Sequence, residues 1–209
     1  MSALDNIDIY TEPDDVDVDT LRNLGPLRPL AGVWEGTKSM DVNPKADGPE
    51  RQPYVERIEL QPIDPQANGP QLLYGLRYHT RIVKPGEIET FHDQVGYWLW
   101  EPATETITLS LAIPRAQVAL AVGRARPDAT AFEVRAERGK TDYGICSGTF
   151  LEQAFRTDSF RMKVTVNPDG TWSYFMDTVL MVRGTAEFHH TDENTLIRIA
   201  APTPNPLMR

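Results

Sequence analysis

Cysteine is almost absent from this sequence: the 209 residues contain one, Cys146, so no disulfide can form within the chain. A single thiol is typical of a protein in a reducing compartment, and we expect a cytoplasmic location. The sequence also lacks any apolar run near the roughly 18 residues that a transmembrane helix needs. Its N-terminus has no basic region followed by an apolar stretch, so we expect neither a signal peptide nor membrane insertion.

The common motifs of catalysis are absent as well. No P-loop, dinucleotide-binding glycine fingerprint or serine nucleophile elbow occurs, and neither does C-x-x-C or H-E-x-x-H. A zinc site takes three or four good ligands, and the four scattered histidines and one cysteine of this sequence do not suggest one. Nothing local supports a cysteine nucleophile at Cys146 either.

Positive charge is scarce, with 21 Lys and Arg against 30 Asp and Glu and a net charge of −9. Residues 1–20 hold seven acidic residues and no basic ones, so the remainder carries only −2 (−9 minus −7). An acidic chain without a basic stripe is a poor partner for nucleic acid or an anionic membrane. We interpret residues 1–24 as a solvated, acidic N-terminal arm.

Period-2 alternation, the pattern of β-strands, is abundant. Residues 71–83 show it most clearly, because apolar or aromatic side chains alternate with polar ones. His79 falls on the polar face and is expected to lie outside. The side chains predicted to share the inner face are Leu72, Tyr74, Leu76, Tyr78, Thr80 and Ile82.

Further strand-like segments follow at intervals of about 8–12 residues, separated by turn signals. The strongest turn signal is Asn167-Pro168-Asp169-Gly170, since Asn and Gly tolerate positive φ. Thr191–Asn194 is interpreted as another turn, placed just before the last strand. The segments predicted as strands are 88–100, 107–113, 117–123, 131–137, 160–166, 172–182 and 195–199.

This spacing predicts an all-β fold, and a closed barrel is preferred because it leaves no open sheet edges. We expect a closed antiparallel β-barrel of about 8–10 strands over residues 25–200, similar to lipocalins and fatty-acid-binding proteins, able to enclose a small ligand. Helix should be sparse: short turns at 16–23 and 25–30, with 147–154 either a helix or a loop. The proline-rich tail 201–209 should be irregular.

Trp34 stands between Gly32 and Gly36 at the start of the barrel pattern. A large aromatic side chain can plug one end of a barrel, while Gly36 allows another group to approach the backbone closely. A contact with the ligand is equally well supported, and the two interpretations are compatible.

His189 and His190 are adjacent, and neighbouring residues in an extended chain point to opposite sides. At most one of them therefore faces the cavity, and for a lone histidine a surface or hydrogen-bonded role is the more common one. His92, which precedes Gly96-Tyr97, is interpreted as structural. Arg115 and Arg198 are candidates for a buried anion contact, against the default of a surface position.

Several of these residues together resemble the nitrobindin family, whose members are haem-binding β-barrels. Each motif is weak alone, but six in the family's order over residues 26–200 are fairly specific. The matches are Gly32-x-Trp34-x-Gly36; Tyr74 with Thr80; His92-x-x-x-Gly96-Tyr97, in which Gln94 replaces a glutamate; Ile113-Pro114; Tyr174; and a histidine followed by L-x-R at the end of the domain.

The resemblance implies a b-type haem whose iron is held by the histidine before the last strand. That residue is His190 here, with His189 as the alternative, and a carboxylate such as Asp192 should hold the second ring nitrogen. Lys38 replaces the third glycine of the family's opening, where it could bond a propionate or crowd the haem edge. The other residues expected near the cofactor are Gly32, Trp34, Gly36, Thr37, Tyr74, Thr80, His92 and Arg115.

The resemblance also implies a five-coordinate ferric haem that reacts with nitric oxide or isomerises peroxynitrite to nitrate. One alternative is a metal-free barrel that binds a fatty acid or another apolar ligand. The last strand reads Arg198-Ile199-Ala200 and lacks the Arg-x-Tyr of the fatty-acid binders, which argues against a close relationship with them. A second alternative is a metal-free catalyst built on Arg115, Tyr74 and His92. The oligomeric state, including a homodimer, stays open.

Overall fold

Alternation of buried and exposed side chains runs along the strands of the computed structural model, which describes residues 8–209. In β4 (Gln71–Val83) the residues from Tyr74 to Ile82 follow it with one exception, Gly75, which is buried under Leu99. The side chains predicted for the inner face of this strand are buried or half-buried, and His79 is exposed, as expected.

Strands make up 61% of the chain and helix 9%, which confirms the expected all-β class. The helical elements are α1 (Thr20–Asn23), η1 (Gly25–Leu30), α2 (Thr149–Ala154) and η2 (Pro206–Met208). The strands are β1 (Gly32–Lys45), β2 (Gly48–Pro62), β3 (Gln66–Asn68), β4 (Gln71–Val83), β5 (Thr90–Glu101), β6 (Thr106–Ile113), β7 (Gln117–Arg124), β8 (Ala131–Arg138), β9 (Gly144–Ser147), β10 (Phe155–Val166), β11 (Trp172–Val182) and β12 (Ala186–Ala200).

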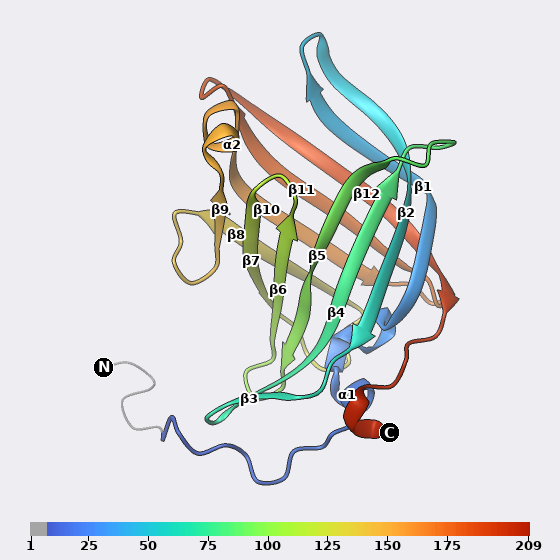
Figure 1. The fold of residues 1–209 in the computed structure, drawn as a ribbon, viewed down its shortest axis with the longest axis vertical. Helices are drawn as coiled ribbons and strands as arrows, with labels where there is room; N and C mark the ends of the chain where they lie inside the picture. Colours follow the sequence, from blue (N-terminus) through green and yellow to red (C-terminus); the bar gives the residue numbers. More distant parts are fainter. Residues whose placement is uncertain (1–7) are drawn as a thin grey trace.

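The sheet closes into a barrel because β2 pairs with both β1 and β4 (Figure 1). Within the described residues the barrel has eleven strands, and β3 is a short addition to β4. Pairing is antiparallel except between β8 and β9. The four-residue strand β9 inserts between β7 and β8, which otherwise meet at a single pair, and this insertion adds one strand to the expected maximum of ten.

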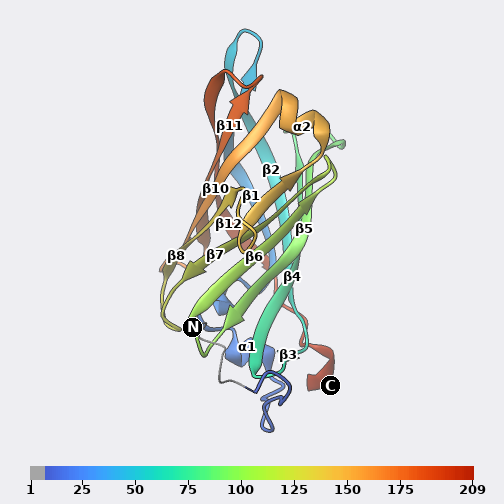
Figure 2. The ribbon, with the colours of Figure 1, turned by 90° about the vertical axis from the view of Figure 1, so that its left-hand side faces the viewer.

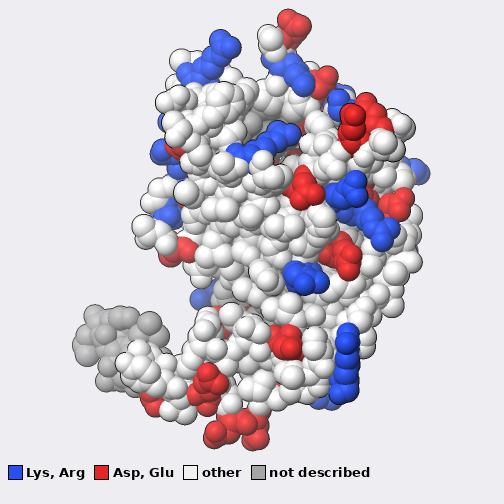
Figure 3. All heavy atoms as spheres, in the orientation of Figure 1, with Lys and Arg blue, Asp and Glu red and all other residues white. Residues whose placement is uncertain are grey.

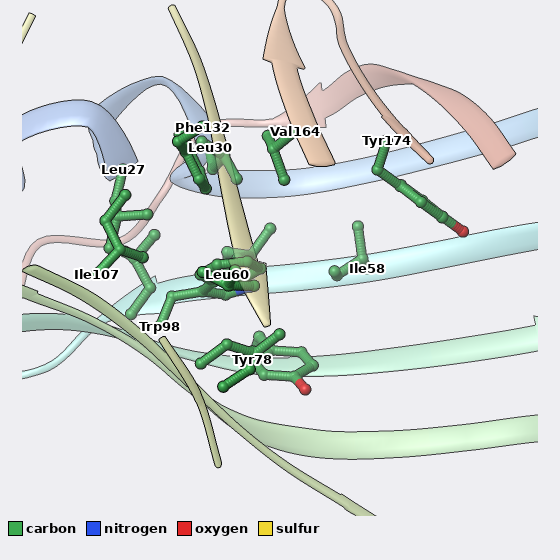
Figure 4. Close-up of a cluster of buried hydrophobic side chains, with 14 of the residues drawn as sticks. Leu27, Leu30, Ile58, Leu60, Tyr78, Trp98, Ile107, Phe132, Val164 and Tyr174 are labelled. Carbon is green, nitrogen blue, oxygen red and sulfur yellow. The ribbon is translucent and has the colours of Figure 1, made fainter. Parts of the chain in front are cut away.

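One end of the barrel is closed by the segment that precedes β1. Leu27 and Leu30 of η1 are fully buried, and each contributes roughly 1.5–3 kcal/mol relative to an exposed side chain. Trp34 donates from Nε1 to the Leu30 carbonyl at 2.7 Å and meets Trp172 edge to face. In Figure 4, Leu27 and Leu30 lie in one cluster with Trp98 and Phe132 from the strands. Trp34 is therefore part of the plug.

The opposite end carries the β1–β2 hairpin, which extends beyond the rest of the barrel in both side views (Figures 1 and 2). The loop between β4 and β5, the turn between β6 and β7, and α2 gather at the same end. This end is called the mouth below. No helix among residues 8–209 has the length and apolarity to cross a bilayer.

A β-bulge interrupts β1 and reverses its alternation. Gly36 pairs with Glu56 and Ser39 with Tyr54, so Thr37 and Lys38 together oppose one residue of β2. Trp34 and Gly36 face inward before the bulge, and Ser39 and Asp41 face inward after it. The bulge therefore turns Asp41 into the barrel and leaves Thr37 and Lys38 exposed.

The turn predicted at Thr191–Asn194 is wrong. β12 runs without interruption from Ala186 to Ala200, and the hairpin lies earlier, at 183–185, with Gly184 at φ +70°. The polar residues that suggested a turn are Asp192 and Asn194, which point into the barrel and are buried there. Polarity alone could not separate a solvated turn from a buried polar cluster.

The segment around Val18 and the tail after β12 lie side by side at the closed end of the barrel (Figure 1). Of the predicted arm, residues 1–7 lie outside the described residues, and α1 begins at Thr20. The tail after β12 is irregular as far as η2, and its Asn205 donates to the Val18 carbonyl and to Asp64, at 3.0 Å in each case. The short helices α1 and η1 fall where helical turns were expected, and α2 is a helix where the sequence left helix or loop open.

Candidate functional site

The barrel encloses a cavity of about 410 Å³, within the range of small-molecule sites. Much of its wall is apolar, and a hollow opens near the mouth in the space-filling view (Figure 3). The apolar part of the wall includes Ile58, Ile82, Phe91, Leu109, Leu111, Phe160, Met162, Met176 and Leu180. Polar groups gather on two facing sides of this wall, and they give the cavity its chemistry.

A larger hollow, of about 860 Å³, lies on the outside of the barrel beneath residues 140–146. Outward-facing side chains of β5 and β7 line it, among them Tyr97 and Leu120. Its wall does not include the buried carboxyl groups that line the inner cavity. The inner cavity is therefore the candidate site.

His190 faces the cavity from β12, where two carboxyl groups hold it. Its Nε2 lies 2.8 Å from Oδ1 of Asp41 and 3.6 Å from Oδ2 of Asp192. Asp41 and Asp192 are direct partners across the β1–β12 pair, and His190 stands two residues before Asp192, on the same face. Asn43 donates a further hydrogen bond, of 2.7 Å, to Asp41. Strand register thus brings the three groups together.

Burial and charge act in opposite directions on these groups. Burial by itself would lower the pKa of His190, but the hydrogen bond to Asp41 and the nearby Asp192 carboxylate outweigh it and raise that pKa. Burial raises the pKa of Asp192 to about 7, against the attraction of His190. The group can therefore exchange a proton near neutral pH.

A second polar group lies beside the first, on β2, β11 and β12. The Tyr174 hydroxyl donates to Oε2 of Glu56 at 2.8 Å, and Asn194 Nδ2 donates to the same oxygen at 2.7 Å. Tyr54 extends this hydrogen-bond network, since its hydroxyl lies 2.8 Å from the Tyr174 hydroxyl. In Figure 4 the Tyr174 hydroxyl points away from the apolar cluster.

Glu56 is the carboxyl of this second group, and it is buried. Its burial raises the pKa to about 7, although the hydrogen bonds from Asn194 and Tyr174 act the other way. A carboxyl group in that range is a proton carrier at neutral pH, which is the property that general acids and bases need.

The opposite side of the cavity is formed by β4 and β5 and is nearly uncharged. Gln94 donates from Nε2 to the Tyr78 hydroxyl at 2.6 Å, and His92 Nε2 lies 3.4 Å from Gln94 Oε1. Burial lowers the pKa of His92, and the charges of Arg115 and His190 lower it further. His92 is consequently a neutral imidazole near pH 7. Arg115 lies at the mouth and donates to the Phe91 carbonyl at 3.3 Å.

The inner wall also contains a donor without a partner. Nε1 of Trp172 is buried and makes no hydrogen bond to the described residues 8–209. Trp172 lines the cavity and packs on Trp34 at the closed end. A buried unsatisfied N–H costs roughly 1–3 kcal/mol, and an acceptor atom on a ligand would remove that cost.

Four of the residues expected near a cofactor line the cavity: Thr80, His92, Arg115 and His190. His189 lies outside the barrel, with Nδ1 2.9 Å from Asp177. The other expected residues are not part of the cavity wall. Gly32 and Trp34 lie at the plug, Gly36 is packed under Asn194, Thr37 and Lys38 are in the exposed bulge, and Tyr74 is buried near Asp17 and Arg22.

Sequence reasoning missed Asp41, Tyr54, Glu56 and Lys45, which all belong to the β1–β2 hairpin and line the cavity. A signal for Glu56 exists, because Tyr54, Glu56, Ile58 and Leu60 alternate with outward residues. A carboxyl group in the inner register of a strand is a candidate functional residue. The bulge hides the corresponding signal for Asp41.

The close packing of Gly36 against Asn194 allows a test of the hydrogen bonds around Glu56. A Cβ at Gly36 would lie 2.3 Å from Asn194 Nδ2, so Gly36→Ala must displace Asn194 from Glu56. We expect urea unfolding to show a loss of about 1–2 kcal/mol. In an Asn194→Ala background the same substitution should cost clearly less, and an equal cost in both backgrounds would contradict this explanation.

Comparison with known proteins is consistent with this geometry. Residues 23–198 match the family model described as a THAP4-like, haem-binding β-barrel domain, which is the nitrobindin family. No curated protein sequence matches the chain.

Among solved structures, Rv2717c from M. tuberculosis is similar in fold, with a TM-score of 0.55 and 20% identity over 87% of this chain and 99% of that one. A β-barrel-like protein of unknown function from Brucella abortus matches at a TM-score of 0.24 and 8% identity, over 80% of this chain and 97% of that one. The second likeness is too weak to support an argument.

Proposed function

This chain belongs to the THAP4-like, haem-binding β-barrel domain family, and we propose that it binds haem b in the barrel cavity with His190 as the axial ligand. The observation that carries the proposal is the inward-facing imidazole of His190, hydrogen-bonded to Asp41 beside an apolar wall. Histidines that bind metals usually hold a carboxylate or carbonyl through their other ring nitrogen. Asp41 supports this arrangement more directly than Asp192, the carboxyl nearest in sequence.

The residues of the cavity fit a haem in three respects. The apolar side chains of the wall suit a flat macrocycle, and the basic side chains Arg115 and Lys45 line the cavity near its mouth, where they would pair with propionates. Lys45 takes the role that the sequence suggested for Lys38, which is exposed in the bulge. The unpaired Nε1 of Trp172 offers a hydrogen bond to a ligand atom that reaches the closed end.

We propose that the site reacts with nitric oxide or isomerises peroxynitrite. When bound, haem would supply an iron atom with one face open to a small ligand. The protein's part is to keep the facing wall neutral with His92, Gln94 and Tyr78, and to attract an anion through Arg115. His189 is the weaker choice of ligand because its ring lies outside, between Asp177 and Glu187.

A metal-free lipid-binding barrel is the rival, because the same apolar wall could hold an acyl chain. Fatty-acid binders of this architecture grip the carboxylate with an arginine on the last strand. Here Arg198 stacks on Trp34 at 4.6 Å and donates to the Pro29 carbonyl at 2.9 Å, outside the cavity wall. That arginine is therefore occupied, which disfavours the rival.

The test is a direct competition between the two ligands. Haem-free protein mixed with hemin should develop a Soret band of a histidine-ligated haem, and it should bind hemin more tightly than a long-chain fatty acid. Displacement of a fluorescent fatty acid by hemin, followed in both directions, gives the order of affinities. Tight fatty-acid binding without a Soret change would establish the rival.

A further inference from the structure

Asp192 is a buried carboxyl group that lacks a hydrogen-bond donor. It is 8% exposed, yet no nitrogen or hydroxyl among the described residues donates a hydrogen bond to it. Its carboxyl group instead faces the carboxyl of Asp41, while His190 Nε2 is 3.6 Å away. Two buried carboxyl groups side by side need a shared proton or a cation between them.

Asp41, in contrast, is fully partnered. It accepts hydrogen bonds of 2.7 Å from Asn43 and 2.8 Å from His190. The oxygens of Asp192 therefore have no nitrogen or hydroxyl donor within hydrogen-bond distance, and their near neighbours are the Asp41 carboxyl group and His190 Nε2. They point into the space bounded by Asp41 and His190, since the ligand atoms of all three lie within 4.8 Å of one another.

We propose that Asp41, His190 and Asp192 form a site for a divalent first-row transition ion in the protein that holds no haem. Metal–ligand bonds of about 2.1 Å place neighbouring ligand atoms about 3.0 Å apart in octahedral geometry and about 3.4 Å apart in tetrahedral geometry. The distances of 2.8 and 3.6 Å from His190 Nε2 to the two carboxylates bracket that spacing. Small side-chain shifts would bring all three groups onto one ion.

One nitrogen and two carboxylate oxygens suit Fe²⁺, Co²⁺ or Zn²⁺ better than the purely oxygen-bound Mg²⁺ or Ca²⁺. The ligands stand on two hydrogen-bonded strands, β1 and β12, so their positions are set by sheet register and not by a loop. Three protein ligands leave coordination positions open toward the cavity, as in catalytic metal sites. The ion would take Nε2 of His190, whereas haem would take the other ring nitrogen. A neutral imidazole has a free lone pair on only one nitrogen, so the ion and haem exclude each other.

The outer surface supplies a matched control. His189 of β12 and Asp177 of β11 form the same kind of residue pair on the outside of the barrel, with 2.9 Å between Nδ1 and Oδ1. In this pair only His189 is half exposed, the second carboxylate near its ring is the exposed Glu187, and Arg161 lies 3.6 Å from Asp177. Ion binding that depends on the inner group must therefore survive Asp177→Asn.

The experiment is a titration of tag-free, haem-free protein with Co²⁺, followed by its visible absorption. We expect one equivalent to bind, with affinity at least 10-fold weaker in Asp192→Asn and in His190→Ala, and unchanged in Asp177→Asn. Asp41→Asn replaces Asp192→Asn if far-UV circular dichroism shows that the latter is unfolded. No cobalt spectrum in the wild type, or equal binding by Asp192→Asn, overturns the site.

Hemin titrations of the same variants separate this inference from the haem proposal. Asp192→Asn should lose cobalt binding and still give a Soret band with hemin, whereas His190→Ala should lose both cobalt binding and the Soret band. Wild-type protein that gives a Soret band without binding cobalt refutes only the divalent site. Cobalt binding without any Soret band refutes only the haem proposal.

Discussion

Replacing His190 with alanine should abolish axial coordination of haem, and hemin mixed with this variant should keep the absorption of unligated hemin. The reason is geometric, because His190 is the cavity-facing histidine that a carboxylate holds, 2.8 Å from Asp41. Loss of an outer-shell partner typically weakens metal binding 10- to 100-fold, so loss of the ligand itself should cost more than that. A hemin titration followed at the Soret band measures the effect.

His189→Ala is the matched control, since it removes the neighbouring imidazole from the outer face, where Asp177 holds it. Its Soret spectrum should equal that of the wild type. His92→Ala completes the set, because His92 is the other histidine of the cavity wall. If His190→Ala keeps the wild-type spectrum and His92→Ala loses it, the ligand lies on β5 and the assignment to His190 is wrong.

The strands were most predictable where inward and outward residues alternate without a defect. Residues 71–83 were predicted as a strand, and β4 has those bounds. The turn at Asn167–Gly170 was also predictable, since its chemistry is local; it closes with a hydrogen bond of 3.1 Å from Gly170 N to the Asn167 carbonyl. Closure of the barrel through β2 and β4 is a long-range event that local patterns do not encode.

The β1–β2 hairpin shows why the candidate site was harder to predict than the fold. The bulge at Thr37–Lys38 shifts the alternation by one residue, so no single period runs through β1. Residues 53–60 do alternate, but they place the charged Glu56 on the inner face, which a search for apolar residues passes over. Asp41 and Glu56 are therefore visible only once the register is known.

The same argument applies to the end of the chain. The family resemblance pointed to His190 as the iron ligand, but the local sequence pattern placed this residue just before a turn that does not exist, ahead of a strand thought to begin at Thr195. The structure turns His190, Asp192 and Asn194 inward by simple alternation along one strand. A run of polar residues in a strand can be explained only by partners from other strands, here Asp41 and Glu56.

Glu56→Gln should make the protein more stable at pH 8, and the gain should disappear in acid. Burial raises the pKa of Glu56 in the folded state to about 7, from an unfolded value of 4.5. Between these values the folded state binds more protons than the unfolded one, so the free energy of unfolding falls as pH rises from 4.5 to 7. At 1.36 kcal/mol per pKa unit, the contribution lost above pH 7 is roughly 3 kcal/mol.

Glutamine has nearly the same shape, and its carbonyl oxygen can still accept the hydrogen bonds from Tyr174 and Asn194. The difference in unfolding free energy between Glu56→Gln and wild type, measured by urea denaturation of haem-free protein, should therefore rise through this window and level off above pH 7. Glu59→Gln, on the exposed face of the same strand, should give a flat difference curve. If the two curves coincide, Glu56 is ionised at neutral pH in the folded barrel, and a cation must be compensating its charge.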